Sequence, residues 1–589
     1  MKHIRSQFLS IFLAAALCLG LLGCQAQEPS SAQEPASPPP EVQEPQGTPA
    51  TETENLVKLC KVWGYTKYMH PAFLLGKKDW DQELLALIPQ VREAESAEAV
   101  NELLHTWFVS LGEIDYEART PVVAWSAAED QNKVIEADTA WTGDAAYLGE
   151  ALAADFAQFP EALPKVDRSK APVQFALYGT GTPDFSNEPE HTGDYSDPNF
   201  RLLGLFRLWN AFEYYYPYLH LMDRDWGELL TEAVPQMLEG ADQTSYELNL
   251  RLLANQVCDP HVLLDNASID WAEVLAPYTL PISCTPAEGK LVVTWLAPGF
   301  SLPLEKGDVL LKIDGRSIEE LYRERSKYFS LPRDEVGLII WSFLLLCENE
   351  TIETTVLRDG EELTLTCTGV LLYGDGYPEP PGEPELQPYE LLEGNIGLIN
   401  PEYTNLETFM EGMDTFRDTD GLIIDLRQYP DWESAVYLSA YLLEKLVPGM
   451  VFASPSQAVP GAYVKQAAHY GYQRSYGSKV YHYDKPVAVL ISSNTMSRPE
   501  MFATIYALAE NTVLIGTNSM GTDGNVVYLP LPGGTSVSFT SLGCYEVDGS
   551  QTQRIGIAPD IPVEPTIQGI AEDRDEVLEA AVEYIKNKS

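Results

Sequence analysis

The chain has 589 residues, with 38 lysines and arginines against 87 aspartates and glutamates, so its formal net charge is −49. A chain of this length is expected to contain more than one domain. Its strong negative charge repels phosphate backbones, which excludes nucleic acid as an expected partner.

The N-terminal residues have the layout of a bacterial secretion signal. Positive charges near the start precede an apolar run, 8–22, that is too short for a comfortable membrane span. The run ends at Leu21-Leu22-Gly23-Cys24, which resembles a lipobox, the motif in which the cysteine is lipidated and becomes the new N-terminus. The alternative is an ordinary signal peptide with a chance cysteine. We expect residues 1–24 to be a lipoprotein signal peptide that leaves the protein extracytoplasmic and anchored to the cell membrane through Cys24.

Residues 25–55 are rich in Pro, Glu, Ser, Gln and Thr and have almost nothing to bury, which predicts a disordered tether. The later cysteines are scattered and show neither C-x-x-C nor metal-ligand spacing, so we expect buried thiols and neither a disulfide framework nor a zinc site. These cysteines are Cys60, Cys258, Cys284, Cys347, Cys367 and Cys544.

Two copies of a helical module are predicted over residues 56–272. The first copy, with an irregular α/β segment after it, is expected over 56–200, and the second over 201–272. Six residues recur at one constant offset, and their aromatic members are expected to be core. Trp63, Tyr68, Pro71, Trp80, Pro89 and Gln90 recur as Trp209, Tyr214, Pro217, Trp226, Pro235 and Gln236.

Only the second copy carries a histidine near its C-terminal end. It reads Asp259-Pro260-His261, whereas the first copy reads Glu113-Ile114-Asp115 at the same offset. A lone histidine near a helix end is usually structural, but an Asp-x-His turn could hold this ring in the open. His261 is therefore the candidate general base, because a neutral imidazole accepts a serine proton at neutral pH.

A small β domain is predicted over residues 273–375. The string Leu304–Gly315, LEKGDVLLKIDG, gives a turn, a strand and a second turn, and strands are expected over 351–357 and 363–367. This pattern resembles a PDZ domain, a module that adds a peptide as an extra edge strand. The alternative is a domain that only supports its neighbours.

Residues 386–571 have the pattern of a buried α/β sheet, followed by a C-terminal helix within 572–589. Short apolar runs at 396–399, 421–427 and 487–491 are typical of strands covered on both faces. After the third run come a polar elbow, 492–497, helical spacing from Met501, and another strand at 513–515. The elbow would lie beyond the carboxyl ends of the strands, where open α/β sheets bind ligands.

Ser497, at the mouth of that helix, has two interpretations that are compatible. Ser497-Arg498-Pro499-Glu500 is a capping box, which needs no catalytic role. Ser497 is also a candidate nucleophile, because the N–H groups and positive dipole end of a helix suit the oxyanion that forms when a serine attacks a carbonyl. As a nucleophile it would need a base from elsewhere in the chain.

Five motifs in this order resemble the tail-specific (C-terminal-processing) serine peptidase family. They are Asp259–His261, the PDZ-like string, Ile424–Arg427, Ser497-x-x-Glu500 and Gly556–Asp560. The resemblance implies a multidomain α+β protein with a crotonase-like α/β protease core, a PDZ-like β domain and helical modules. It implies Ser497 as nucleophile, a peptide or protein substrate, and no cofactor.

The chain departs from the family pattern at the base and at the oxyanion loop. Many members use a lysine just beyond the glycine that corresponds to Gly521, where this chain has Thr522. The tricorn-like branch uses a histidine from the D-x-H turn, which His261 fits, and a late glutamate, at whose position Gln553 stands. A glutamine could orient an imidazole but would not stabilise its charge. Gln553 and Asp523 are the candidates for the third member.

Family members commonly show Asn-Pro-Gly-Gly after the Asp-Leu-Arg strand end, where this chain has the loop 428–432, Gln-Tyr-Pro-Asp-Trp. Pro430 has no N–H, so the expected oxyanion donors are the amides of Asp431 and Arg498. We predict a lipid-anchored serine peptidase that works through an acyl-enzyme on Ser497. The alternative is an inactive peptide- or glycan-binding lipoprotein on the same scaffold.

Overall fold

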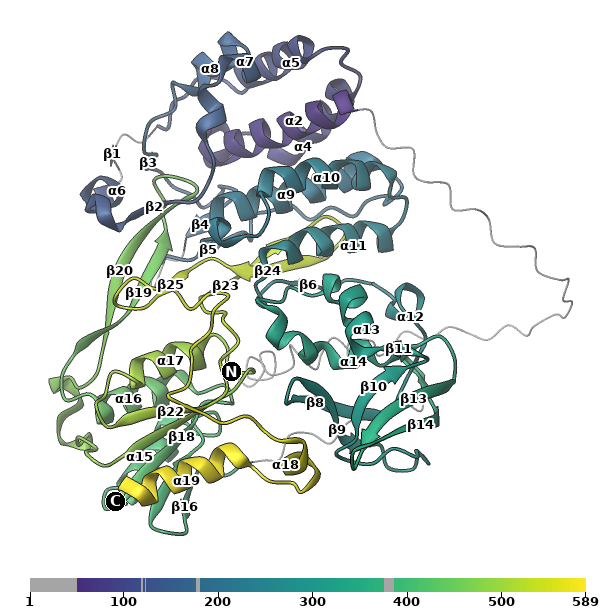
Figure 1. The fold of residues 1–589 in the computed structure, drawn as a ribbon. Helices are drawn as coiled ribbons and strands as arrows, with labels where there is room; N and C mark the ends of the chain where they lie inside the picture. The colour runs from purple at the N-terminus through teal and green to yellow at the C-terminus, as the bar shows by residue number, and fades with distance from the viewer. Residues whose placement is uncertain (1–49, 118–119, 122, 176–180, 375–385, 589) are drawn as a thin grey trace, which may run out of the picture. The chain divides into compact units, whose positions relative to one another are not determined.

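The computed structural model describes residues 50–117, 120–121, 123–175, 181–374 and 386–588 (Figure 1). The predicted signal peptide, Cys24 and nearly all of the tether lie outside the described residues. Helix α2 (Ala50–Met69) begins inside the range predicted as tether, so the helical part starts earlier than expected. Within the described ranges, no helix is long and apolar enough to cross a membrane.

The two helical copies have matching helices that pack against each other. In each copy a tryptophan of the first helix hydrogen-bonds to the residue that opens the second long helix: Trp63 Nε1 donates to the Trp80 carbonyl, and Trp209 Nε1 to the Trp226 carbonyl, both at 2.8 Å. The aromatic residues of both copies share one buried core. The first copy has α2, α4 (Trp80–Arg92) and α5 (Ala97–Ser110), and the second has α9 (Pro198–Tyr215), α10 (Trp226–Glu239) and α11 (Gln243–Ala254).

Short helices and strands connect the long helices of the two copies and lead into the next domain. Between α2 and α9 along the chain they are α3 (Pro71–Leu74), β1 (Thr120–Pro121), α6 (Val123–Ala127), β2 (Lys133–Ile135), α7 (Ala145–Leu148), α8 (Glu150–Phe156), β3 (Pro164–Lys165), β4 (Gln174–Phe175) and β5 (Pro183–Asp184). After α11 come β6 (Leu263–Asp265), α12 (Trp271–Val274) and β7 (Tyr278–Thr279).

The predicted β domain contains an antiparallel sheet in the order β14-β13-β10-β9-β8, with β11 beside β10. Its core also includes residues of α13 and α14. The assignment of this sheet to the PDZ class stays a prediction. The elements are β8 (Ile282–Ala287), β9 (Lys290–Leu296), β10 (Val309–Ile313), β11 (Arg316–Ser317), α13 (Ile318–Arg325), α14 (Trp341–Leu344), β12 (Leu346–Cys347), β13 (Thr351–Arg358), β14 (Glu361–Thr368) and β15 (Val370–Leu371).

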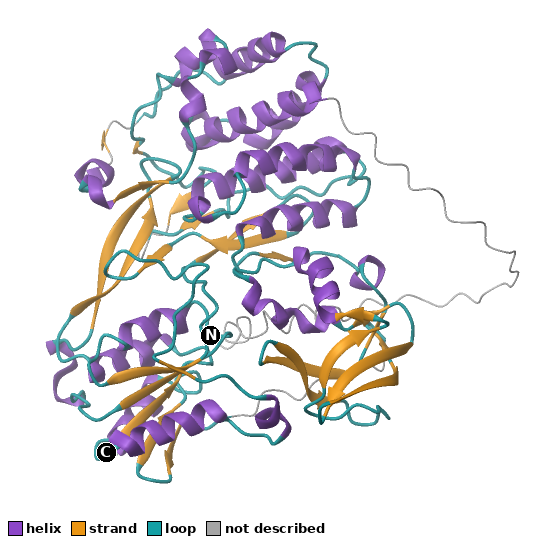
Figure 2. Ribbon diagram, in the orientation of Figure 1, coloured by secondary structure: helices purple, strands orange, loops and turns teal. Residues whose placement is uncertain are grey.

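The predicted α/β region is a six-stranded sheet with helices on both faces, as Figure 2 shows. Its order is β16-β17-β18-β21-β22-β26, and all neighbours are parallel except β16 and β17. Within β21, Val487, Val489 and Ile491 pack with α15, α16 and α17. Ala488 and Leu490 pack on the other face with α19. This alternation explains the continuous apolar run.

The elements of this region and of its extensions complete the chain. They are β16 (Tyr389–Leu392), β17 (Ile396–Ile399), α15 (Leu406–Thr415), β18 (Gly421–Asp425), α16 (Trp432–Leu442), β19 (Val447–Pro455), β20 (Ala462–Tyr470), β21 (Val487–Ile491), α17 (Arg498–Tyr506), β22 (Thr512–Gly516), β23 (Val526–Pro530), β24 (Ser536–Thr540), β25 (Gly543–Tyr545), β26 (Ile561–Pro562), α18 (Ile567–Ala571) and α19 (Glu576–Lys588).

One small sheet joins the second helical copy to the α/β region. Strand β24 pairs with β23 as a hairpin and also with β6, with Ser538 opposite Leu263. Because β6 follows the Asp259–His261 turn directly, this pairing brings His261 next to the end of β24. The six cysteines of the described chain are free thiols, and all but the half-buried Cys258 are buried.

Candidate active site

Ser497 lies in a strained backbone turn at the carboxyl end of β21. Its φ of 64° and ψ of −126° are unusual for a residue with a side chain. A strained strand-to-helix turn of this kind exposes the nucleophile of α/β-hydrolases at the edge of their sheet. The Ser497 N–H donates to the Thr522 carbonyl at 2.6 Å, which fixes the turn. Strain held in this way clusters at functional sites.

The predicted capping box is wrong, because neither of its two side-chain bonds forms. The Ser497 hydroxyl makes no capping hydrogen bond to α17. The Glu500 carboxylate instead accepts hydrogen bonds from the Ser519 hydroxyl, from the Gly521 N–H at 2.7 Å and from the Thr522 N–H at 2.8 Å. The hydroxyl of Ser497 is therefore not engaged by the helix that it precedes.

Glu500 instead ties α17 to the segment 519–522. Its side chain is fully buried, and burial raises its pKa to about 7, although the bonds from Ser519, Gly521 and Thr522 lower it. Since Thr522 also accepts the Ser497 N–H, the Glu500 carboxylate and the Ser497 turn bond to the same segment. Glu500 thus acts on the position of Ser497 through Thr522.

His261 lies just before β6, and its ring is buried, with only 8% of the residue exposed. The expectation that the Asp-x-His turn holds the ring in the open is therefore wrong. Its Nδ1 lies 2.9 Å from the Thr540 hydroxyl and 3.7 Å from Asp259 Oδ1. The same Asp259 oxygen accepts the backbone N–H of His261 at 2.9 Å. Burial lowers the pKa of His261, with Asp259 acting in the opposite direction. The imidazole is therefore neutral at pH 7, as a base must be.

Contacts rather than a direct hydrogen bond connect His261 with Ser497. Across the described ranges, no hydrogen bond joins the His261 ring to the Ser497 hydroxyl. Gly524, two residues after Thr522, packs so closely on Thr540 that a Cβ there would lie 2.7 Å from the threonine methyl group. The segment 519–524 therefore contacts the serine turn at Thr522 and, at Gly524, the threonine that contacts the histidine.

The structure pairs Gln553 with Asp523, the two candidates for the third catalytic member. The Asp523 N–H donates to Gln553 Oε1 at 3.3 Å, and the Asp523 carboxyl accepts the Gly524 N–H at 2.7 Å. Burial, and then the charge of Glu500, raises the pKa of Asp523 well above its usual range. In the part of the chain that the structure describes, neither residue hydrogen-bonds to His261.

Thr540 takes the position beside His261 Nδ1, and the sequence gives no signal for it. Thr540 lies 279 residues from His261 along the chain. Only the pairing of β24 with β6 brings the two together. Known triads have a carboxylate or an amide as the hydrogen-bond partner of the catalytic histidine. A threonine at the end of a hairpin is therefore not considered as the partner of His261 when only the sequence is known.

The oxyanion side of the site differs from the expectation. The Asp431 N–H already donates to the Pro401 carbonyl at 3.0 Å, so the prediction that this amide receives the oxyanion is wrong for this structure. The Arg498 amide is the first N–H of α17, a position that has no partner inside a helix. It is the donor that the geometry supports.

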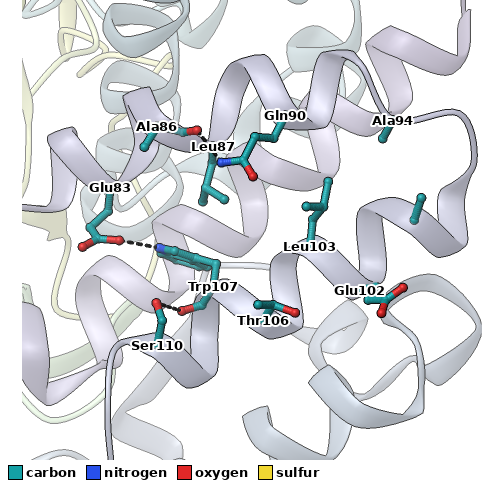
Figure 3. Close-up of a pocket in the computed structure, with 11 residues that line it drawn as sticks. Glu83, Ala86, Leu87, Gln90, Ala94, Glu102, Leu103, Thr106, Trp107 and Ser110 are labelled. Atoms are coloured by element: carbon teal, nitrogen blue, oxygen red, sulfur yellow. Dashed lines mark hydrogen bonds between the residues drawn. The ribbon is translucent and has the colours of Figure 1, made fainter.

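A pocket of about 620 Å³ lies elsewhere, between α4 and α5 (Figure 3). Glu83 lies at one end of the pocket, where its carboxylate accepts a hydrogen bond from Trp107 Nε1 at 3.1 Å. None of the predicted catalytic residues lines this pocket. No group of three or more His, Cys, Asp or Glu side chains in the described ranges is arranged to hold a metal ion.

Comparisons with known proteins place the sheet in a peptidase family. Residues 396–563 match the family model "Peptidase family S41". No curated protein sequence matches the chain. Among solved structures, a mutant of CPAF is similar with a TM-score of 0.52 at 13% identity, covering 67% of this chain and 98% of its own. The photosystem II D1 C-terminal processing protease has a TM-score of 0.36 at 17% identity, covering 65% and 98%.

A putative peptidase from Parabacteroides merdae is similar with a TM-score of 0.41 at 15% identity, covering 66% of this chain and 97% of its own. The matched residues include Ser497, its turn and the parallel strands on either side. The chain is therefore a serine-type peptidase. Residues 396–563 form a domain of peptidase family S41, the tail-specific peptidases.

Proposed function

We propose that the protein is a lipid-anchored, extracytoplasmic peptidase that cuts peptide bonds through an acyl-enzyme on Ser497, with His261 as general base. The observation that carries this proposal is the strained turn of Ser497 at the carboxyl end of β21, with its hydroxyl free of the helix cap. PDZ-like and crotonase-like architectures for the β domain and the core belong to the same proposal.

The reaction runs in two halves. Ser497 Oγ attacks the scissile carbonyl carbon while His261 Nε2 takes the hydroxyl proton, and the carbonyl oxygen becomes an oxyanion that accepts the Arg498 N–H. The C–N bond then breaks as His261 returns the proton to the leaving amine, which leaves an ester on Ser497. Water adds to this ester with His261 again as base. The bond between the acyl carbon and Ser497 Oγ then breaks as His261 returns the proton to Oγ, and the carboxylic acid departs.

The neighbours of the ring define which nitrogen acts. The Asp259 carboxylate lies 3.7 Å from Nδ1, so the proton of the neutral imidazole is favoured there, donated to Thr540. Nε2 then carries the lone pair that a base needs. We propose that Nε2 reaches the Ser497 hydroxyl in the substrate complex, because catalytic hydrogen bonds often tighten only there.

A fluorophosphonate probe, which reacts with activated serines, tests this function. We expect the purified chain to be labelled at Ser497, Ser497→Ala to lose the label, and His261→Ala to label far more slowly. Ser493→Ala is the matched control, because Ser493 lies in the same elbow, its backbone N–H donates to Thr517, and its hydroxyl has no hydrogen-bond partner among the described residues. Equal labelling of Ser497→Ala and wild type, or no labelling of either, would favour the alternative of an inactive peptide- or glycan-binding protein.

The membrane anchor is proposed from the lipobox-like residues before Cys24. In bacteria that process lipoproteins, we expect the full chain to sediment with membranes and to carry a lipid mass on its N-terminal peptide. Cys24→Ser should remove both. A membrane fraction that is unchanged by Cys24→Ser would contradict lipid anchoring.

A further inference from the structure

The two segments that flank the nucleophile meet through one arginine. Arg498 follows Ser497, and its Nη1 donates to the Pro430 carbonyl at 2.9 Å. Its guanidinium lies over the Tyr429 ring at 4.8 Å and 5.8 Å from the Trp432 ring. The loop 428–432, which stands where the family has Asn-Pro-Gly-Gly, is thus built around the side chain of the residue next to the nucleophile.

This arrangement leaves hydrogen-bonding capacity on the guanidinium. An arginine that stacks on an aromatic ring uses its face, while its five N–H donors point outward in its plane. One of them binds Pro430, and none is bonded to a carboxylate within the described ranges. Arg427, which directly precedes this loop, is different, because it is paired with both Asp425 and Asp575.

Arg498 is half-buried, and among the described residues its guanidinium forms no ion pair. Beside it, Trp432 is 47% exposed, although its ring packs on Phe502 at 5.6 Å. An aromatic ring that is fixed on one side and open on the other offers apolar area at little cost in side-chain entropy. The cation of the residue that follows Ser497 and the open ring therefore stand together.

We propose that Arg498, Tyr429 and Trp432 form a substrate subsite that binds a carboxylate of the peptide near the scissile bond. The carboxylate is either an acidic side chain or the free C-terminus, since both present the two oxygens that a guanidinium binds in a bidentate pair. The indole of Trp432 covers the apolar part of the neighbouring substrate residue. This inference names the substrate class of the proposed peptidase and rests on that function.

Binding to the Ser497→Ala variant of the full chain tests the subsite without requiring cleavage. The probes are fluorescein-labelled peptides of alanine and leucine with one Glu, each matched by a peptide with Gln at the same position. Both are made with a free C-terminal carboxylate and with an amide. We expect at least about tenfold tighter binding of the carboxylate-bearing member of one pair, as a charge-assisted hydrogen bond provides.

The position of the preferred carboxylate distinguishes its source. A preference for Glu over Gln in the amidated peptides identifies a side chain, and a preference for the free C-terminus over the amide identifies the chain end. In the Ser497→Ala background, Arg498→Gln should abolish the preference. Arg474→Gln, which removes an exposed arginine of the segment Arg474–Lys479, should keep it.

Equal binding of carboxylate and amide forms, or no binding of any peptide, would overturn the subsite. A preference that survives Arg498→Gln would overturn the role of Arg498. These results are separate from failure of the proposed function, because serine-dependent labelling by the fluorophosphonate reports on Ser497 alone. A chain that labels at Ser497 and shows no carboxylate preference keeps its function and loses only this inference.

Discussion

Thr540→Val is the sharpest test of the proposed base, because it removes the hydroxyl beside His261 Nδ1 and keeps the shape of the side chain. The change leaves the Nδ1–H in a buried site without an acceptor at 2.9 Å. An unsatisfied buried donor costs about 1–3 kcal/mol. This cost falls on the tautomer that carries its lone pair on Nε2, so the reactive form of His261 becomes less populated.

The expected result is a fall of about 5- to 150-fold in the rate of serine labelling, since each 1.36 kcal/mol corresponds to a factor of ten. The assay is the second-order rate constant for fluorophosphonate labelling of Ser497, measured beside the melting temperature of each variant. Thr540→Ser, which restores a hydroxyl, should recover most of the rate.

Thr535→Val is the matched control on the same hairpin. Thr535 is also buried, but its hydroxyl has no hydrogen-bond partner among the described residues. We expect this variant to label at the wild-type rate. If Thr540→Val labels as fast as the wild type, Thr540 does not orient the base, and the assignment of His261 through this contact fails.

Three further predictions follow from the same structure. Because burial lowers the pKa of His261, labelling should be constant above pH 6.5 and fall only in more acidic solution; a midpoint above 6.5 would contradict a buried neutral base. Glu500 has its pKa raised from 4.5 to about 7, so its share of stability, about 3 kcal/mol, is present below pH 4.5 and lost as pH rises to 7. Chemical denaturation should show that the free energy of unfolding falls less steeply with pH over this range in Glu500→Gln than in the wild type. Glu411→Gln, on the exposed face of α15, should keep the wild-type slope, and equal slopes for Glu500→Gln and the wild type would refute the raised pKa of Glu500. Trp63→Phe and Trp209→Phe should each destabilise the fold by about 1–3 kcal/mol, since each leaves a buried carbonyl without its 2.8 Å donor; loss in only one copy would contradict their equivalence.

Local patterns were enough to predict the parallel sheet and the repeated helices. Continuous apolar runs such as Val487–Ile491 indicate a strand covered on both faces, and the structure places helices on both. The repeated Trp63 and Trp209 make the same hydrogen bond in each copy. These features depend on residues close in sequence or on a constant offset, which a single sequence displays.

The connections within the site could not be predicted in the same way. The sequence Ser-x-x-Glu is the same whether the glutamate completes a capping box or accepts hydrogen bonds from a distant segment. The sequence therefore could not reveal that Glu500 bonds to a segment 19–22 residues away. The contact of His261 with Thr540 depends on strand pairing across the chain. The burial of the His261 ring depends on that pairing as well, and the turn residues alone favoured an open ring.

The strained turn at Ser497 requires support from several directions, and the hydrogen bonds around it supply that support. A positive φ at a serine costs about 1–3 kcal/mol and persists only where the surroundings determine it. Here the Thr522 carbonyl accepts the Ser497 N–H, and the Thr522 N–H is held in turn by the buried Glu500. Thr495 fixes the other end of the elbow, since its hydroxyl accepts the Ser492 N–H and donates to the Leu426 carbonyl of the neighbouring strand's end. A serine that served only to begin a helix would relax to an ordinary cap conformation, so the retained strain argues that the hydroxyl of Ser497 is presented for chemistry.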